Sequence, residues 1–124
     1  MVWAMKQTEH DSQVILVRWF DLQYPKYAGR LYAVPNGGAR HPAVAAKLKA
    51  EGVRRGIPDL HLPIRTPFFS GLVIEMKAET GRMTVEQADW IDFFSSQGFA
   101  AVVCKSLSSA QETIKSYIRQ IPSE

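Results

Sequence analysis

The spacing of apolar side chains divides this chain into segments of helical and of extended character. Apolar residues three and four positions apart are typical of a helix with one buried stripe, whereas short runs that are apolar or alternating are typical of strands. Helical spacing or composition marks the segments 8–22, 41–51, 84–97 and 106–121. Strand-like patterns mark the segments 30–34, 60–64, 72–77 and 99–104. The pattern thus predicts the order α-β-α-β-β-α-β-α.

Capping and turn residues support several of these bounds. The run from Thr84 to Gln87 is a full capping box and predicts the start of a helix. The run 35–38, Pro-Asn-Gly-Gly, has strong turn chemistry and ends the strand before it. Asn36 could belong to a hairpin turn, but the helical composition of 41–51 favours a strand followed by a helix.

The order of elements suggests how the strands pair. The strands 60–64 and 72–77 are predicted to form a hairpin, and a crossover through the helix 84–97 would place 99–104 parallel to 72–77. The continuous apolar run 99–104 is typical of a central strand buried on both faces. The many aromatic residues of the helix 84–97 are interpreted as core rather than as a base-stacking platform. The expected fold class is α/β, a small mixed sheet flanked by helices.

Length and composition indicate a single domain over residues 1–124, in which an apolar share of 46% allows one core. No apolar run approaches the ~20 residues of a membrane-spanning helix, so no membrane partner is expected. Residues 1–7 are expected to be a loose N-terminus, and residues 1–6 lack the apolar middle of a signal peptide. The single Cys104 cannot form an internal disulfide and is interpreted as a small buried residue. A reducing cytoplasm is the expected compartment.

The net charge of +3 is unevenly distributed along the chain. Residues 40–82 hold eight basic and four acidic side chains, whereas residues 83–124 hold three basic and five acidic ones. The positive excess in the middle of the chain suits a polyanionic partner. Solvated lysines and arginines on an ordinary surface explain it equally well.

Three polar side chains around the predicted hairpin indicate metal chemistry. Glu75 and Lys77 lie two residues apart in an apolar strand, so they share one of its faces. Asp59 opens the preceding strand, and the splayed ends of a hairpin can bring it near Glu75. Two carboxylates and a lysine around one point would make a site for a hard divalent cation and an activated water. The adjacent Arg54 and Arg55 are well placed for phosphates, or else belong to a solvated loop.

The order of these residues resembles the PD-(D/E)xK nucleases, and more closely their VRR-NUC branch. The resemblance rests on Gly56-Ile57-Pro58-Asp59, on Glu75-Met76-Lys77, on Gln87, and on the upstream Pro35-Asn36-Gly37 and Glu9. It spans nearly the whole chain, roughly residues 9–117. It implies a restriction-endonuclease-like fold in a minimal stand-alone protein of phage or bacterial type. The implied location is the cytoplasm of a bacterial or phage-infected host cell.

The resemblance also implies roles for individual residues. The catalytic set is Asp59, Glu75, Lys77 and Gln87, and the metal ligands are Glu9, Asp59, Glu75 and the backbone carbonyl of Met76. The metal would be Mg²⁺ or Mn²⁺. The expected DNA contacts are Asn36, Arg40, Arg54, Arg55 and Arg82. Two of these roles have an alternative, since Glu9 also fits a first-turn glutamate favoured by the helix dipole, and Gln87 also fits the capping box.

The function expected from these residues is a metal-dependent endonuclease that recognises DNA structure rather than sequence, because the chain holds little beyond a catalytic core. Cutting of symmetric substrates favours a homodimer, and the resemblance implies four-way (Holliday) junctions as substrate. One alternative is a non-catalytic nucleic-acid-binding module on the same fold. Others are a nuclease for flaps or other branched or linear DNA, and a small protein-interaction domain with fortuitous carboxylates.

Overall fold

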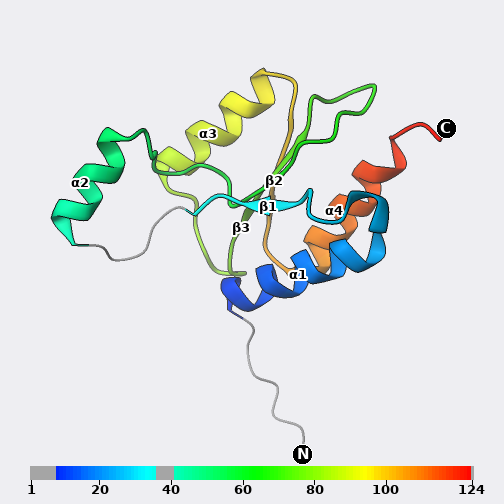
Figure 1. Ribbon diagram of the computed structural model, residues 1–124, viewed down its shortest axis with the longest axis horizontal. Coiled ribbons are helices and arrows are strands. Elements are labelled where there is room, and N and C mark those ends of the chain that lie inside the picture. Colours follow the sequence, from blue (N-terminus) through cyan, green and yellow to red (C-terminus); the bar gives the residue numbers. More distant parts are fainter. Residues whose placement is uncertain (1–7, 36–40, 124) are drawn as a thin grey trace, which may run out of the picture.

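The computed structural model describes residues 8–35 and 41–123 (Figure 1). The elements follow in the order α1 (Glu9–Gln23), the 3-10 helix η1 (Pro25–Tyr27), β1 (Tyr32–Ala33), α2 (Pro42–Ala50), β2 (Leu60–Leu62), β3 (Leu72–Met76), α3 (Val85–Ser96), β4 (Ala100–Cys104) and α4 (Leu107–Arg119). This confirms the predicted order, with β1 and β2 shorter than the pattern indicated. Among the described residues, no helix is long and apolar enough to span a membrane.

The four strands form one sheet in the order β1-β2-β3-β4. β2 pairs antiparallel with both β1 and β3, whereas β3 and β4 pair in parallel through the α3 crossover. Leu60 lies opposite Ile74, and Glu75 lies opposite Val103. The predicted hairpin and the predicted parallel crossover are both present. Because β2 and β3 run in opposite directions, the residue before β2 lies beside the end of β3.

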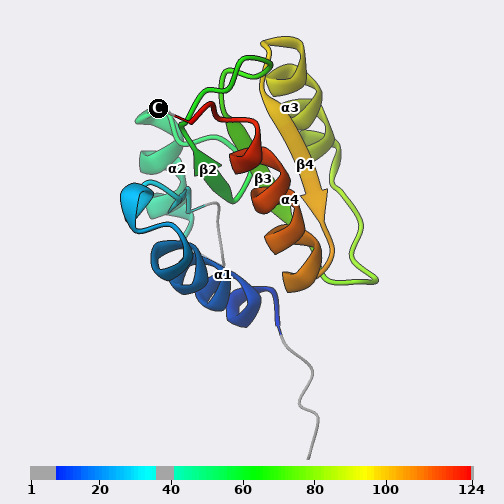
Figure 2. The same ribbon diagram turned by 90° about the vertical axis from the view of Figure 1, so that its right-hand side faces the viewer.

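One face of the sheet packs against α1 and α4 (Figure 2). Leu16 and Phe20 of α1 are fully buried in the same core as Leu72 and Ile74 of β3. The sequence pattern accounts for these positions, because residues four apart share a helix stripe and residues two apart share a strand face. Cys104 is also fully buried, as predicted. The core therefore fixes α1 across one face of the sheet.

The other face of the sheet lies under α3, which is less buried than the sequence predicted. His61 of β2 contacts this helix, with 5.5 Å between its ring centroid and that of Phe94. Within α3, which is described in full, no residue is fully buried, and Phe93 is 53% exposed. The interpretation of its aromatic residues as interior core was therefore wrong. Only one stripe of α3 turns toward the sheet, and its outer side faces solvent.

β4 lies at the edge of the described sheet, not at its centre as its apolar sequence indicated. It pairs with β3, and the residues from Ala100 to Val103 are only partly buried. The prediction was wrong because a continuous apolar run reports that both faces of a strand are covered, not that both edges are paired. Here α3 and α4 cover the two faces.

α2 stands apart from the sheet (Figure 1). Its residues are exposed except for Leu48, which is partly buried. His41 caps the start of the helix: its Nδ1 accepts a hydrogen bond from the backbone N–H of Ala43 at 3.1 Å, and Pro42 occupies the first turn. α2 is therefore held mainly by its own caps and by the chain on either side, and it leaves open space between itself and α3.

Candidate active site

The candidate site lies where β2 begins and β3 ends. Asp59 directly precedes β2, and its Oδ2 accepts a hydrogen bond from the backbone N–H of Met76 at 2.8 Å. The backbone carbonyl of Asp59 accepts another from the N–H of Val34, also at 2.8 Å. The backbone and the side chain of Asp59 are both fixed, so its carboxylate is held against the end of β3.

Glu75 is the buried acid of this site, with only 2% of its surface exposed. Burial raises its pKa to about 9, and a side-chain hydrogen bond with Asp59 and the charge of Asp59 contribute to the rise. The Lys77 ammonium acts in the opposite direction, and Glu9 adds a smaller upward effect. A hydrogen bond between two carboxyl groups requires a proton on one of them. The two acids, separated along the chain, therefore meet at one point.

The first turn of α1 reaches the same end of the sheet. Oε1 of Glu9 accepts a hydrogen bond from the backbone N–H of Ala78, just after β3, at 2.8 Å. Burial of Leu16 and Phe20 on the same stripe of α1 sets the helix at this position. The helix dipole alone does not account for this contact. Glu9 is thus near the carboxylate pair, with one oxygen engaged in holding the backbone after Lys77.

The donor atoms of the site suit a hard divalent cation. In the described ranges, no three His, Cys, Asp or Glu side chains surround one point as a ready metal site. Mg²⁺ needs fewer protein ligands, because it keeps several waters and commonly binds through one or two carboxylates. Asp59 and Glu75 supply two, and a cation between them would replace the proton that they share. The donor set therefore fits Mg²⁺ or Mn²⁺.

Gln87 is engaged in the capping box of α3. Its side-chain Oε1 accepts a hydrogen bond from the backbone N–H of Thr84 at 2.9 Å. The backbone N–H of Gln87 donates a second one to Oγ1 of Thr84 at 3.1 Å. The side-chain amide nitrogen is the group that remains for a substrate or a water. The capping role is present in this structure, and the catalytic role stays a prediction.

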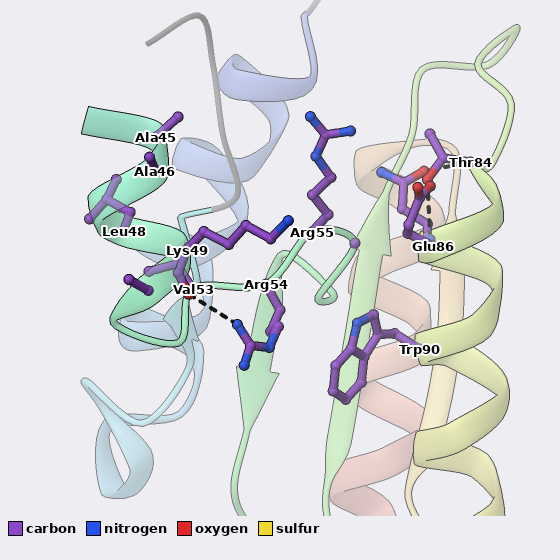
Figure 3. Close-up of a pocket in the computed structure, with 13 residues that line it drawn as sticks. Ala45, Ala46, Leu48, Lys49, Val53, Arg54, Arg55, Thr84, Glu86 and Trp90 are labelled. Atoms are coloured by element: carbon purple, nitrogen blue, oxygen red, sulfur yellow. Dashed lines mark hydrogen bonds between the residues drawn. The ribbon is translucent and has the colours of Figure 1, made fainter. Parts of the chain in front are cut away.

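The predicted DNA contacts fall in three places. Arg54 and Arg55 line a groove between α2 and the start of α3 (Figure 3). Nη1 of Arg54 donates a hydrogen bond to a backbone carbonyl of α2 at 3.2 Å, which orients the guanidinium. Arg82 is exposed in the loop before α3. Asn36 and Arg40 lie outside the described residues, and their roles stay predictions.

Two residues of this groove were not identified from the sequence. Lys49 lines it from α2 and Trp90 from α3 (Figure 3). Lys49 carries no motif, and Trp90 was assigned to the core because aromatic residues on a helix usually are buried. A sequence signal was present only for the loop between them, where Gly56 marks a close approach of two backbone segments.

The fold and the site define a class of protein. A small mixed sheet with helices on both faces, paired acids at the ends of two adjacent strands and a lysine beside them are the features of a restriction-endonuclease-like protein of nuclease type. The VRR-NUC domain matches residues 7–108. The chain therefore belongs to the VRR-NUC family, as the resemblance in its sequence predicted.

Solved structures agree with this assignment. One, named as a VRR_NUC domain protein, has a TM-score of 0.83 and 27% identity, and the match covers 97% of this chain and 95% of the other. A second, named as a VRR_NUC domain, has a TM-score of 0.54 and 17% identity over 86% of this chain and 97% of its own, and bears on the fold alone. No curated protein matches the chain.

Proposed function

We propose that this chain is a metal-dependent endonuclease that cuts DNA at branched structures. The observation that carries the proposal is the meeting of Asp59 with Glu75, close enough to Lys77 that the ammonium lowers the pKa of Glu75. Hydrolysis of a phosphodiester requires an in-line water, neutralised charge on the phosphate and help for the leaving oxygen. Two acids and an amine around one point are groups that meet these needs.

The acids form the metal-binding part of the proposed site. Asp59 and Glu75 would hold Mg²⁺ or Mn²⁺ through oxygen, with Glu9 and the backbone carbonyl of Met76 as further ligands. When bound, the ion supplies a Lewis acid and lowers the pKa of a coordinated water. The hydrogen bond from the Met76 N–H to Asp59 keeps one of these carboxylates in position before the metal arrives.

Lys77 and Gln87 act on the water and the phosphate. The ammonium of Lys77 orients the attacking water and stabilises the negative charge that develops on the phosphate oxygens. The amide nitrogen of Gln87 positions the water or a neighbouring group. The phosphates on either side of the cut are bound by the basic and polar side chains Asn36, Arg40, Arg54, Arg55 and Arg82.

We further propose that a homodimer acts on four-way (Holliday) junctions. In the described part of one chain there is one such carboxylate pair, whereas resolution of a junction requires cuts in two strands. A two-fold dimer supplies two sites related by the symmetry of the substrate.

A nicking assay tests this function. Junction, flap, single-stranded and linear duplex DNA are incubated with Mg²⁺, Mn²⁺ or EDTA, and the mass of the protein in solution is measured in parallel. We expect metal-dependent cuts, strongest on the junction, and a dimeric mass. The variants Asp59→Ala, Glu75→Ala and Lys77→Ala each lose cutting by about 100-fold or more while they retain DNA binding.

Two outcomes contradict the proposal. Cleavage at the wild-type rate by any one of these variants would show that its side chain does not take part in the chemistry. Salt-sensitive retention of DNA without cuts in either metal would favour the non-catalytic binding module.

A further inference from the structure

A wide groove separates α2 from α3 beside the candidate site (Figure 3). Its volume is about 1560 Å³, and it is lined by one side of α2, the loop 53–56 and the first turns of α3. Gln87, one of the predicted site residues, also lines it. Because α2 is exposed along its length apart from Leu48, nothing in the described chain fills the groove.

The charges along the groove suit a polyanion. Its basic lining residues are Lys49, Arg54 and Arg55, and Lys49 extends from α2 toward Arg55 (Figure 3). Glu86 is the acidic side chain among the lining residues. The positive excess attracts phosphates. It disfavours α2 of a second copy as the occupant, because that helix carries Lys47 and Lys49 and would bring like charges together.

Trp90 gives the groove an aromatic surface as well. Its indole is partly exposed, and its ring centroid lies 5.8 Å from those of Phe93 and Phe94, which support it from the same helix. An indole in the wall of a groove can stack on a base only when that base has left the duplex stack. Basic side chains around an exposed aromatic ring are typical of surfaces that bind single-stranded nucleic acid.

The floor of the groove is tied to the candidate site. Gly56 has a φ of 83°, and a Cβ there would lie 2.6 Å from the backbone carbon of Glu86. The loop 53–56 is thus in close contact with the start of α3. The same loop continues directly into Asp59. Nucleotides in the groove would therefore lie next to the strand that enters the site.

We infer that this groove binds an unpaired stretch of the DNA strand beside the cut, with a base stacked on Trp90 and phosphates on Lys49, Arg54 and Arg55. The inference rests on the proposed nuclease function. It implies that branched DNA, a four-way junction included, is bound with a base unstacked at the branch point. A fully stacked duplex offers phosphates to the groove but no base to Trp90.

Binding without cleavage tests this inference separately from the nuclease function. In EDTA, fluorescence anisotropy gives the Kd of a labelled oligothymidylate and of a matched strand that has the same phosphates but lacks bases. We expect wild-type protein to bind the oligothymidylate about tenfold or more tightly than the abasic strand. Trp90→Ala loses this preference with unchanged affinity for the abasic strand, and Trp90→Phe keeps part of it.

A matched pair of lysine variants separates phosphate contacts from base contacts. Lys49→Ala weakens binding of both strands alike and reduces the slope of log K against log salt by about 0.7. Lys26→Ala removes the same charge from an exposed position in η1 and leaves both affinities unchanged. Tryptophan fluorescence tests the contact with Trp90 without the alanine variants. In a protein with Trp3 and Trp19 replaced by Phe, we expect oligothymidylate to quench the fluorescence of Trp90 and the abasic strand to leave it unchanged.

Three results overturn the inference. The first is equal affinity of the wild-type protein for the two strands, and the second is unquenched Trp90 emission at saturating oligothymidylate. The third is a concentration-dependent dimer that Trp90→Ala dissociates, while Trp90→Ala still prefers the strand with bases. Trp90 would then contact a second copy of the chain in the groove rather than a base. If the protein prefers the strand with bases but makes no metal-dependent cuts, the groove binds unpaired DNA and the proposed nuclease function is wrong. Failure of the groove inference and failure of the nuclease function are therefore distinguishable.

Discussion

At the scale of single residues, Glu75 determines the protonation state of the site. It lies on a strand whose other four residues are apolar, and burial together with Asp59 raises its pKa to about 9. Without metal, the folded protein therefore holds a proton between the two acids at neutral pH. In the proposed metal site, binding of a divalent cation would release this proton. Folding, metal binding and pH are thus coupled through one carboxyl group.

Replacing Glu75 by Gln should stabilise the metal-free protein. The pKa of Glu75 has its ordinary value of 4.5 in the unfolded chain and rises to about 9 in the folded protein, so between these values the folded state binds more protons than the unfolded state. The free energy of unfolding therefore falls as pH rises through this window. We expect Glu75→Gln to raise the free energy of unfolding by about 2–4 kcal/mol at about pH 8 in EDTA, and to change this free energy little at about pH 4. Urea melts at the two pH values measure this difference.

With Mg²⁺ present, the wild-type protein should become more stable than Glu75→Gln. In the proposed site, Mg²⁺ would bind the ionised pair of the wild-type protein and stabilise the folded state by mass action. We expect added Mg²⁺ to raise the melting temperature of the wild-type protein and to leave Glu75→Gln and Asp59→Asn unchanged. If Mg²⁺ stabilised Glu75→Gln as much as the wild-type protein, the cation would have to bind elsewhere.

What the sequence reveals about single residues depends on whether they conflict with their local pattern. Glu75 interrupts an apolar strand, so its place at a site could be predicted, and the hairpin does bring Asp59 to it. Trp90 fits its surroundings, because aromatic residues on a helix usually pack in a core. Its partial exposure follows because no other described element covers the outer side of α3, which no local pattern records. Gln87 was ambiguous because the sequence fits both a cap and a site residue; the structure shows the cap, and the site role stays a prediction.

At the scale of elements, the contact between the loop 53–56 and α3 gives a matched pair of glycine variants. Gly56 has a φ of 83°, and a Cβ there would lie 2.6 Å and 2.7 Å from backbone atoms of Glu86 and Gln87. Gly52 has a φ of 101°, and nothing lies within 4 Å of its Cβ position. Both alanine variants carry the strain of a left-handed backbone, about 1–2 kcal/mol, but only Gly56→Ala also forces the loop away from α3.

We therefore expect Gly56→Ala to lower the free energy of unfolding by at least about 1 kcal/mol more than Gly52→Ala. It should also slow DNA nicking, because the loop leads into Asp59, whereas Gly52→Ala should nick at the wild-type rate. Denaturant melts and the nicking assay check the two effects. Equal losses in both variants would show that the loop relaxes away from α3 without consequence.

The elements were predictable in order and type, and their burial was not. Apolar spacing, the capping box at Thr84 and the crossover rule fixed the sequence of helices and strands and the parallel pairing of β3 with β4. The position of β4 at an edge and the partial exposure of α3 were missed. The burial of a helix depends on which elements cover the side that faces away from the sheet. In the described structure no further element covers that side of α3.

At the scale of the whole molecule, the helix pair α1 and α4 lies apart from α2 and α3 (Figures 1 and 2). α1 and α4 pack on one face of the sheet, whereas α2 and the start of α3 border the groove beside the candidate site. The positive excess of residues 40–82 was visible in the sequence. The gathering of Lys49, Arg54 and Arg55 in one groove with Gln87 was not, since it depends on how α2 projects from the sheet. This placement favours a substrate strand that passes through the groove to reach Asp59.

The proposed dimer leads to a prediction about paired cuts. In the described residues of one chain there is one pair of acids of this kind, Asp59 with Glu75, so two cuts in one junction require two copies acting together. On a supercoiled plasmid with a cruciform, wild-type protein should give linear DNA directly. Mixing it with an excess of Asp59→Ala forms dimers with one competent site, and nicked circles should then accumulate while linear product falls. Gel analysis of the two products over the mixing ratio measures this shift. Linear product that falls only in proportion to dilution of the wild-type protein, without extra nicked circles, would mean that each copy cuts alone.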